Sequence, residues 1–104
     1  MTVQINFDKT LKGEKRSADF FTSQISEALE RYESQITRIE VHLKDENGKK
    51  DGINDISCLL EARLEGMNPI VASHKADTVD QAISGAIAKI KATIKTIRGR
   101  KQRH

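Results

Sequence analysis

Cysteine is nearly absent from this chain of 104 residues, since Cys58 is the only one. A single thiol cannot form an internal disulfide, which argues against a secreted disulfide scaffold and for a reducing compartment. No stretch approaches the roughly 20 apolar residues that span a bilayer, and the N-terminus lacks the basic start and apolar run of a signal peptide. We therefore expect a cytoplasmic protein that makes no membrane contact.

Aromatic residues and proline are also scarce, with no Trp, one Tyr, three Phe and one Pro. The Phe residues fall beside apolar strand or helix patterns, so no aromatic platform for stacking nucleobases is evident. The content of 37% hydrophobic and 32% charged residues is typical of a folded, soluble chain. The length predicts one domain, which we expect to span 1–98, followed by a basic flexible tail over 99–104.

Acidic residues are missing from the last part of the chain. From Gln81 to His104 there are seven Lys and Arg and no Asp or Glu, whereas residues 1–80 carry 11 bases and 15 acids. Clustered cations bind polyanions, most often nucleic acid, because binding releases condensed counterions. A solvated helix face that only keeps the protein soluble explains the same charges equally well.

Alternation of apolar and polar residues predicts four strands. These cover residues 3–7, 39–43, 56–65 and 70–76. Asn-Gly and Asp-Gly pairs within 45–54 predict a long hairpin loop, and 66–69 predicts a second turn.

Two segments have the apolar spacing of helices. The first helix is expected from about 18 to 33, with Ser17 as its N-cap. The second has the longer apolar stripe; Asp77 or Thr78 caps it, and Gly99 ends or frays it.

The order of these elements predicts an α+β fold, a two-layer sandwich with the order β-α-β-β-β-α. A right-handed crossover makes the first two strands parallel, and both helices cover one face of the four-stranded sheet. The helices should run in the same direction, side by side. That arrangement would bring the loop that carries Lys12, Lys15 and Arg16 near the start of the last helix.

The cations of the last helix form the candidate site. On an ideal helix, Lys91, Lys95 and Arg98 form a ridge along one flank of the apolar stripe, while Lys89 lies on the other flank. Such a ridge can follow phosphates, although Lys and Arg also cover the edges of buried stripes without any ligand. The predicted anion-binding residues are Lys89, Lys91, Lys95, Arg98, Arg100, Lys101 and Arg103, together with Lys12, Lys15 and Arg16 of the loop.

No pattern predicts a metal site or a cofactor. His42, Cys58 and His74 fall on different strands and lack the spacing of metal ligands. Residues 45–48 resemble the start of a calcium loop, but Ile56 stands where the bidentate carboxylate is required.

Catalysis is not predicted either. Glu61, Arg63 and Glu65 alternate on one strand face, which favours cross-strand ion pairing over an acid and base pair. Cys58 sits among core positions, as a small buried hydrophobe does. We therefore expect no enzyme.

Three segments carry a resemblance to a known family. They are ITRIEVHL at 36–43, EARLEG at 61–66, and TVDQAI at 78–83 leading to AKI at 88–90. In this order they resemble the ribosome hibernation-promoting factors, also known as ribosome-associated inhibitors or sigma-factor modulation proteins. The similarity covers nearly the whole chain, and its specificity comes from the combination.

The resemblance implies a β-α-β-β-β-α domain that binds the small ribosomal subunit in the channel used by mRNA and tRNA, and silences translation in starved or stationary-phase bacteria. It implies ribosomal RNA contacts through Lys89, Lys91 and Lys95. Ser84 stands where many relatives have an acid, and the 45–54 loop is longer than in familiar members. The chain resembles the short form, without the C-terminal dimerisation domain, and is expected to be a monomer off the ribosome.

The residues leave a second function open. A protein-interaction module could use the exposed sheet face or an edge strand, with the basic tail incidental. A partner that still binds after removal of 99–104 and after nuclease treatment would favour this alternative.

Overall fold

The computed structural model of this chain describes residues 1–9, 11, 18–46 and 56–102, and for 98–102 it describes the backbone only. Its elements are β1 (Thr2–Phe7), α1 (Ala18–Ala28), the 3-10 helix η2 (Glu30–Tyr32), β2 (Ile36–Asp45), β3 (Ile56–Leu64), β4 (Ile70–Ala76) and α2 (Val79–Gln102). The predicted hairpin loop over 45–54 and the Ser17 cap fall largely or wholly outside the described residues.

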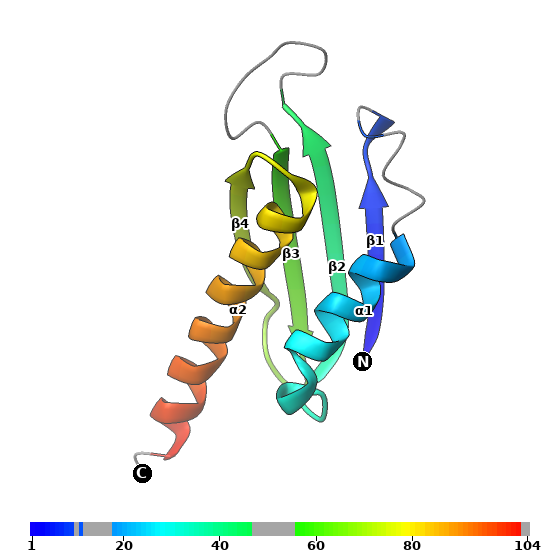
Figure 1. Cartoon of the computed structure of the whole chain (residues 1–104). Helices are drawn as coiled ribbons and strands as arrows, with labels where there is room; N and C mark the ends of the chain where they lie inside the picture. The colour runs from blue at the N-terminus through cyan, green and yellow to red at the C-terminus, as the bar shows by residue number, and fades with distance from the viewer. Residues whose placement is uncertain (10, 12–17, 47–55, 103–104) are drawn as a thin grey trace.

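The four strands form one sheet in the order β1-β2-β3-β4. β1 pairs with β2 in parallel, and the other two pairings are antiparallel. Both helices cover the same face of the sheet and run in the same direction (Figure 1). The predicted α+β sandwich is therefore confirmed, including the parallel crossover through α1.

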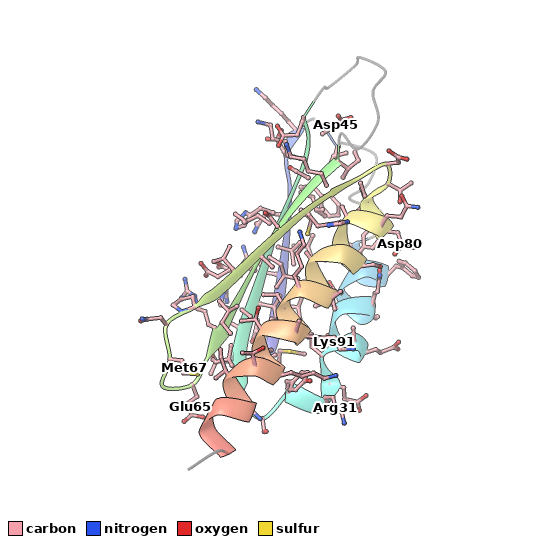
Figure 2. All side chains as sticks on the ribbon, turned by 90° about the vertical axis from the view of Figure 1, so that its left-hand side faces the viewer. Arg31, Asp45, Glu65, Met67, Asp80 and Lys91 are labelled. Carbon is pink, nitrogen blue, oxygen red and sulfur yellow. The ribbon has the colours of Figure 1, made fainter. Side chains whose placement is uncertain are left out.

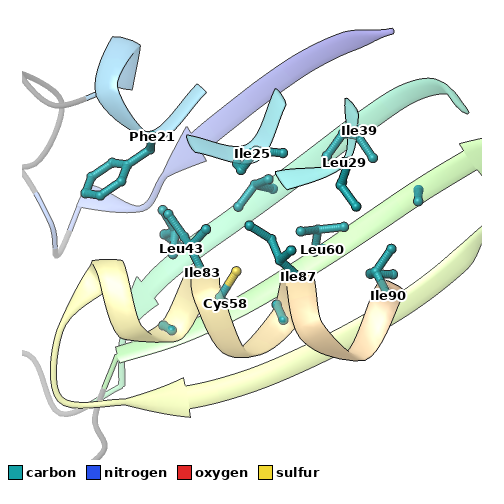
Figure 3. Close-up of a cluster of buried hydrophobic side chains, with 14 of the residues drawn as sticks. Phe21, Ile25, Leu29, Ile39, Leu43, Cys58, Leu60, Ile83, Ile87 and Ile90 are labelled. Carbon is teal, nitrogen blue, oxygen red and sulfur yellow. The ribbon is translucent and has the colours of Figure 1, made fainter. Parts of the chain in front are cut away.

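The core lies between the sheet and the two helices. Alternate residues of β2 and β3 point inward, so Val41 lies opposite Leu60, and Leu43 opposite Cys58. Each of these four side chains is buried. Figure 3 shows the cluster, with side chains from both helices directed at the sheet: Phe21, Ile25 and Leu29 from α1 and its end, and Ile83, Ile87 and Ile90 from α2.

The first helix is shorter than predicted. It ends at Ala28, and a 3-10 turn follows over Glu30–Tyr32, where a helix to about residue 33 was expected. Tyr32 N donates to Leu29 O at 2.9 Å in this tighter turn. Because side chains three residues apart align in a 3-10 helix, Leu29 and Tyr32 both reach the core.

The last helix begins as predicted and ends later. Thr78 is its N-cap, since its Oγ1 accepts a hydrogen bond from Gln81 N at 3.1 Å. The prediction that the helix ends or frays at Gly99 is wrong, because the backbone stays helical through Gln102. Figure 1 shows this end of α2 running past the sheet.

α2 contacts β4 on one side and α1 on the other. Gly85 faces the ring of His74 on β4 so closely that an added Cβ would lie 2.0 Å from His74 Cδ2. On the other side of α2, Gln24 Nε2 of α1 donates to Asp80 Oδ1 at 2.9 Å and to Ser84 Oγ at 3.1 Å. These contacts define a β4 flank and an α1 flank of the helix.

In the part of the chain that the structure describes, no helix is both long and apolar enough to cross a membrane. Within the same residues, no three His, Cys, Asp or Glu side chains lie close enough together to hold a metal ion.

Candidate nucleic-acid interface

Lys91 and Lys95 lie on the α1 flank of α2. Helical geometry places them below Asp80 and Ser84, the two residues that Gln24 of α1 contacts. One turn of helix separates the two lysines, so their Cα atoms are about 6 Å apart along the axis. Two members of the predicted ridge, Lys91 and Lys95, therefore share one flank of a helix that packs on the sheet and contacts α1.

Both lysines of the ridge are available to an anion. Lys95 is exposed and Lys91 is half-buried. Across the described ranges, no carboxylate lies within ion-pair distance of either ammonium group; the ion pairs found there are on the opposite face of the sheet. Two neighbouring cations without carboxylate partners create a positive potential, which favours a polyanion at this flank.

Lys89 lies on the β4 flank and is separated from the ridge. Its Nζ donates to Ser73 O of β4 at 2.6 Å. β4 is an edge strand, and such a strand presents main-chain groups that no neighbouring strand pairs. Lys89 therefore binds a main-chain carbonyl of the edge strand, although an ammonium group has two further donors.

The described geometry combines a β-α-β-β-β-α fold with a cationic ridge on its last helix. The family described as sigma 54 modulation protein / S30EA ribosomal protein matches residues 3–102. The chain belongs to this family. The family assignment confirms the resemblance that the three sequence segments carry, and the matched region extends from β1 to the end of α2.

A solved structure with the same fold is that of a ribosomal subunit interface protein from Coxiella burnetii. It superposes with a TM-score of 0.62 at 14% sequence identity, over 95% of this chain and 99% of that chain. At this identity the likeness concerns the fold. No curated protein sequence matches the chain.

Several predicted contact residues of this S30EA family domain lie outside the described side chains. Lys12, Lys15, Arg16 and Arg103 lie outside the described residues. Arg98, Arg100 and Lys101 lie on the helical backbone of α2, without a described side chain. Because the helix is continuous, position 98 falls on the same flank as positions 91 and 95.

Two side chains of the helical layer are exposed although the sequence did not predict it. Arg31 is exposed in η2, and Figure 2 shows it on the helical side of the molecule together with Lys91. Its neighbours in the sequence, Glu30 and Glu33, are acidic, so the sequence did not indicate a cation at this end of the helical layer. Phe20, expected beside an apolar stripe, is 63% exposed on α1. Its ring packs edge-on against Phe21 instead of entering the core.

The ion pairs of the outer sheet face run along the strands. Arg63 Nε contacts Glu61 Oε1 at 3.0 Å, and Arg38 Nε contacts Glu40 Oε1 at 3.0 Å. Across the strands, Arg38 lies opposite Arg63 and Glu40 opposite Glu61. The predicted cross-strand pairing of Glu61 and Arg63 is therefore wrong, because the register places like charges opposite each other.

The cysteine is a residue of the core. Cys58 is fully buried on the inner face of β3. Burial raises the pKa of its thiol to about 12, because the thiolate would lose its hydration.

Proposed function

We propose that this protein is a non-catalytic translation inhibitor that binds the small ribosomal subunit. It occupies the channel used by mRNA and tRNA, through phosphate contacts of α2, when cells enter stationary phase. One observation carries the proposal: in a domain of the S30EA ribosomal protein family, Lys91 and Lys95 form a ridge without a carboxylate partner among the described residues. The partner is ribosomal RNA, and the action is steric occlusion.

The geometry suits a folded RNA better than a free strand. The ridge belongs to a helix packed along the sheet, so the backbone positions that carry its cations are fixed relative to one another and can match phosphates of a rigid partner. Arg98, Arg100 and Lys101 would extend the contacts beyond the end of the sheet. Shape and phosphate position then determine recognition, and base identity contributes little.

Salt dependence of binding tests the electrostatic part of the proposal. With about six phosphates neutralised, log K should fall with log salt with a slope of roughly −4 to −5. Co-sedimentation with purified small subunits, from low to high salt, measures this slope. Binding that does not change with salt would contradict phosphate contacts.

Charge reversal tests the ridge itself. Lys91→Glu combined with Lys95→Glu should weaken small-subunit binding by at least about a hundredfold, because two phosphate contacts become repulsions. The thermal midpoint should hardly change, since both lysines lie outside the core. Arg38→Glu combined with Arg63→Glu is the matched control, because it makes the same charge change on the opposite face of the sheet, at residues outside α2.

The control variant should lose less than about tenfold in small-subunit affinity, since it changes only the long-range field. Equal losses in both double variants would overturn the assignment of binding to α2. Loss of the folded state in the helix variant would indicate that the lysines stabilise the fold.

Competition tests the location. The protein and a short mRNA should exclude each other from small subunits, and the helix variant should not displace the mRNA. Simultaneous binding of protein and mRNA at saturation would place the protein outside the channel.

A further inference from the structure

The outer face of the sheet carries a second set of cations near the loop that joins β2 to β3. The strand register places Lys44, Ser57 and Lys75 in one row across β2, β3 and β4. Neighbouring strands are about 4.8 Å apart, so the Cα atoms of the two lysines lie roughly 10 Å apart, with the serine position between them. The row is a line of hydrogen-bond donors perpendicular to the strands.

An apolar centre lies beside this row. The next row across the same strands is His42, Leu59 and Ser73. Leu59 is 43% exposed, and Val71, diagonal to it on β4, is 56% exposed. Leu59 and Val71 therefore offer a small apolar surface between polar neighbours.

Two hollows flank this centre, and Ser57 and Leu59 line both of them. Lys44 and His42 line the hollow toward β1, and Lys75 lines the hollow at the β4 edge. Lys89 also lines the second hollow, where its Nζ binds Ser73 O. Each hollow thus combines a cation, a hydroxyl and the side chain of Leu59.

The positive charge is confined to this end of the face. Toward the opposite end, the two Arg–Glu pairs along β2 and β3 neutralise each other. Among the residues that line the two hollows, the acids are Asp8 in the first and Glu46 in the second. Against them stand Lys44, Lys75 and Lys89, so the hollows together carry a net positive charge.

We infer that this surface binds single-stranded RNA, independently of the α2 ridge. The sugar-phosphate chain crosses the strands along the row from Lys44 to Lys75. The bases lie against Leu59 and Val71, in contact with Ser73 or His42. A duplex would present phosphates to the apolar pair, whereas an unpaired strand presents base faces, which can make van der Waals contact with the aliphatic side chains. Leu59 and Val71 alone would also suit a protein, but the row of cations and hydroxyls favours phosphate.

The inference is tested by titrating a fluorescent octauridylate with the protein at low salt, and the fluorescence anisotropy measures the affinity. Lys44→Glu combined with Lys75→Glu should weaken octauridylate binding by at least about tenfold, and this loss should be larger than the loss in Lys91→Glu combined with Lys95→Glu. The variants carry the same change in charge, so the comparison separates the surface from net charge. Binding by the unmodified protein should fall with salt with a slope of about −1.4, as two phosphate contacts to a single strand require.

A second measurement does not depend on the variants. An octamer with a photoreactive 4-thiouridine should crosslink to β3 or β4, within residues 56–76. Crosslinks confined to α2, or greater loss in the helix variant, would overturn the inference and leave the proposed function intact. Octauridylate binding that the sheet variant leaves unchanged, with loss of a protein partner instead, would also overturn it. If the helix variant retains small-subunit binding, the proposed function fails while the sheet surface still stands.

Discussion

At the scale of single residues, the contact between Gly85 and His74 shows why one position of α2 must lack a side chain. An added Cβ would meet the imidazole ring at 2.0 Å from Cδ2. Alanine favours a helix over glycine by about 1 kcal/mol, so Gly85→Ala would be stabilising on a free helix surface. Here the ring must move or the helix must shift, and overpacking of this kind costs about 1–3 kcal/mol.

We therefore predict that Gly85→Ala lowers the free energy of unfolding, measured by urea denaturation. Gly85→Ala in a His74→Ala background removes the clash and should be neutral or stabilising. The double-mutant cycle should then give a coupling of at least about 1 kcal/mol. Additive effects would mean that the ring rotates away freely.

The buried thiol predicts a loss of stability at alkaline pH. The pKa of Cys58 is raised from 9.0 to about 12, so the unfolded chain releases its proton above pH 9 while the folded chain retains it. The contribution to stability is complete below pH 9 and is lost as pH rises toward 12, by about 1.4 kcal/mol per pH unit. Between pH 8 and 10, the free energy of unfolding should fall by about 1.4 kcal/mol more in the natural protein than in Cys58→Ala. Parallel pH profiles would contradict burial of the thiol.

At the scale of elements, α2 carries cations with two different roles. Lys89 donates to the edge of β4, whereas Lys95 is exposed on the other flank. Lys89→Ala should lower the free energy of unfolding by less than about 1 kcal/mol, because water can replace the bond at an exposed carbonyl. It should leave the salt slope of small-subunit binding nearly unchanged, while Lys95→Ala should make the slope less steep by about 0.7–0.9. Equal effects on the slope would place both lysines at phosphates.

Sequence analysis predicted most elements because hydrophobic periodicity determines them. The alternation of β3 gives the same bounds in sequence and structure to within one residue, and the stripe of α2 gives the start of that helix. The break of α1 at Leu29 was not predictable, because a 3-10 turn buries Leu29 and Tyr32 as well as an α-helix would. The ends of elements depend on such local backbone choices, which apolar spacing does not report.

At the scale of the whole molecule, the basic residues 99–104 extend a domain whose core ends earlier. Among the side chains of α2 up to Ile97, which are the ones the structure describes, Ile94 is the last buried one. Removing 99–104 should therefore change the thermal midpoint by less than about 3 °C. It removes Arg100, Lys101 and Arg103, so the salt slope of small-subunit binding should become less steep by about 2. Replacing the three cations by Gln in the full chain is the control, and it should reproduce the change in slope.

The candidate site was predictable only in part. The ridge of Lys91 and Lys95 follows from helix geometry alone. The separation of Lys89 from the ridge required the position of β4, and the row of Lys44 and Lys75 required the register of three strands. Residues that meet across strands lie far apart in the sequence, so a single sequence cannot indicate which ones share a surface.

β1 lies at one edge of the sheet and should be the first strand to unfold locally. β1 has one neighbour, β2, and its inward side chains Val3, Ile5 and Phe7 are only half-buried, whereas the inward side chains of β2 and β3 are buried. Amide protons of β1 should therefore exchange with solvent before those of β3. α2 packs on β3 and β4, so local unfolding of β1 would leave α2, with Lys91 and Lys95, packed on the sheet. Local opening of the N-terminal edge of the sheet should therefore leave a ligand bound to α2 in place.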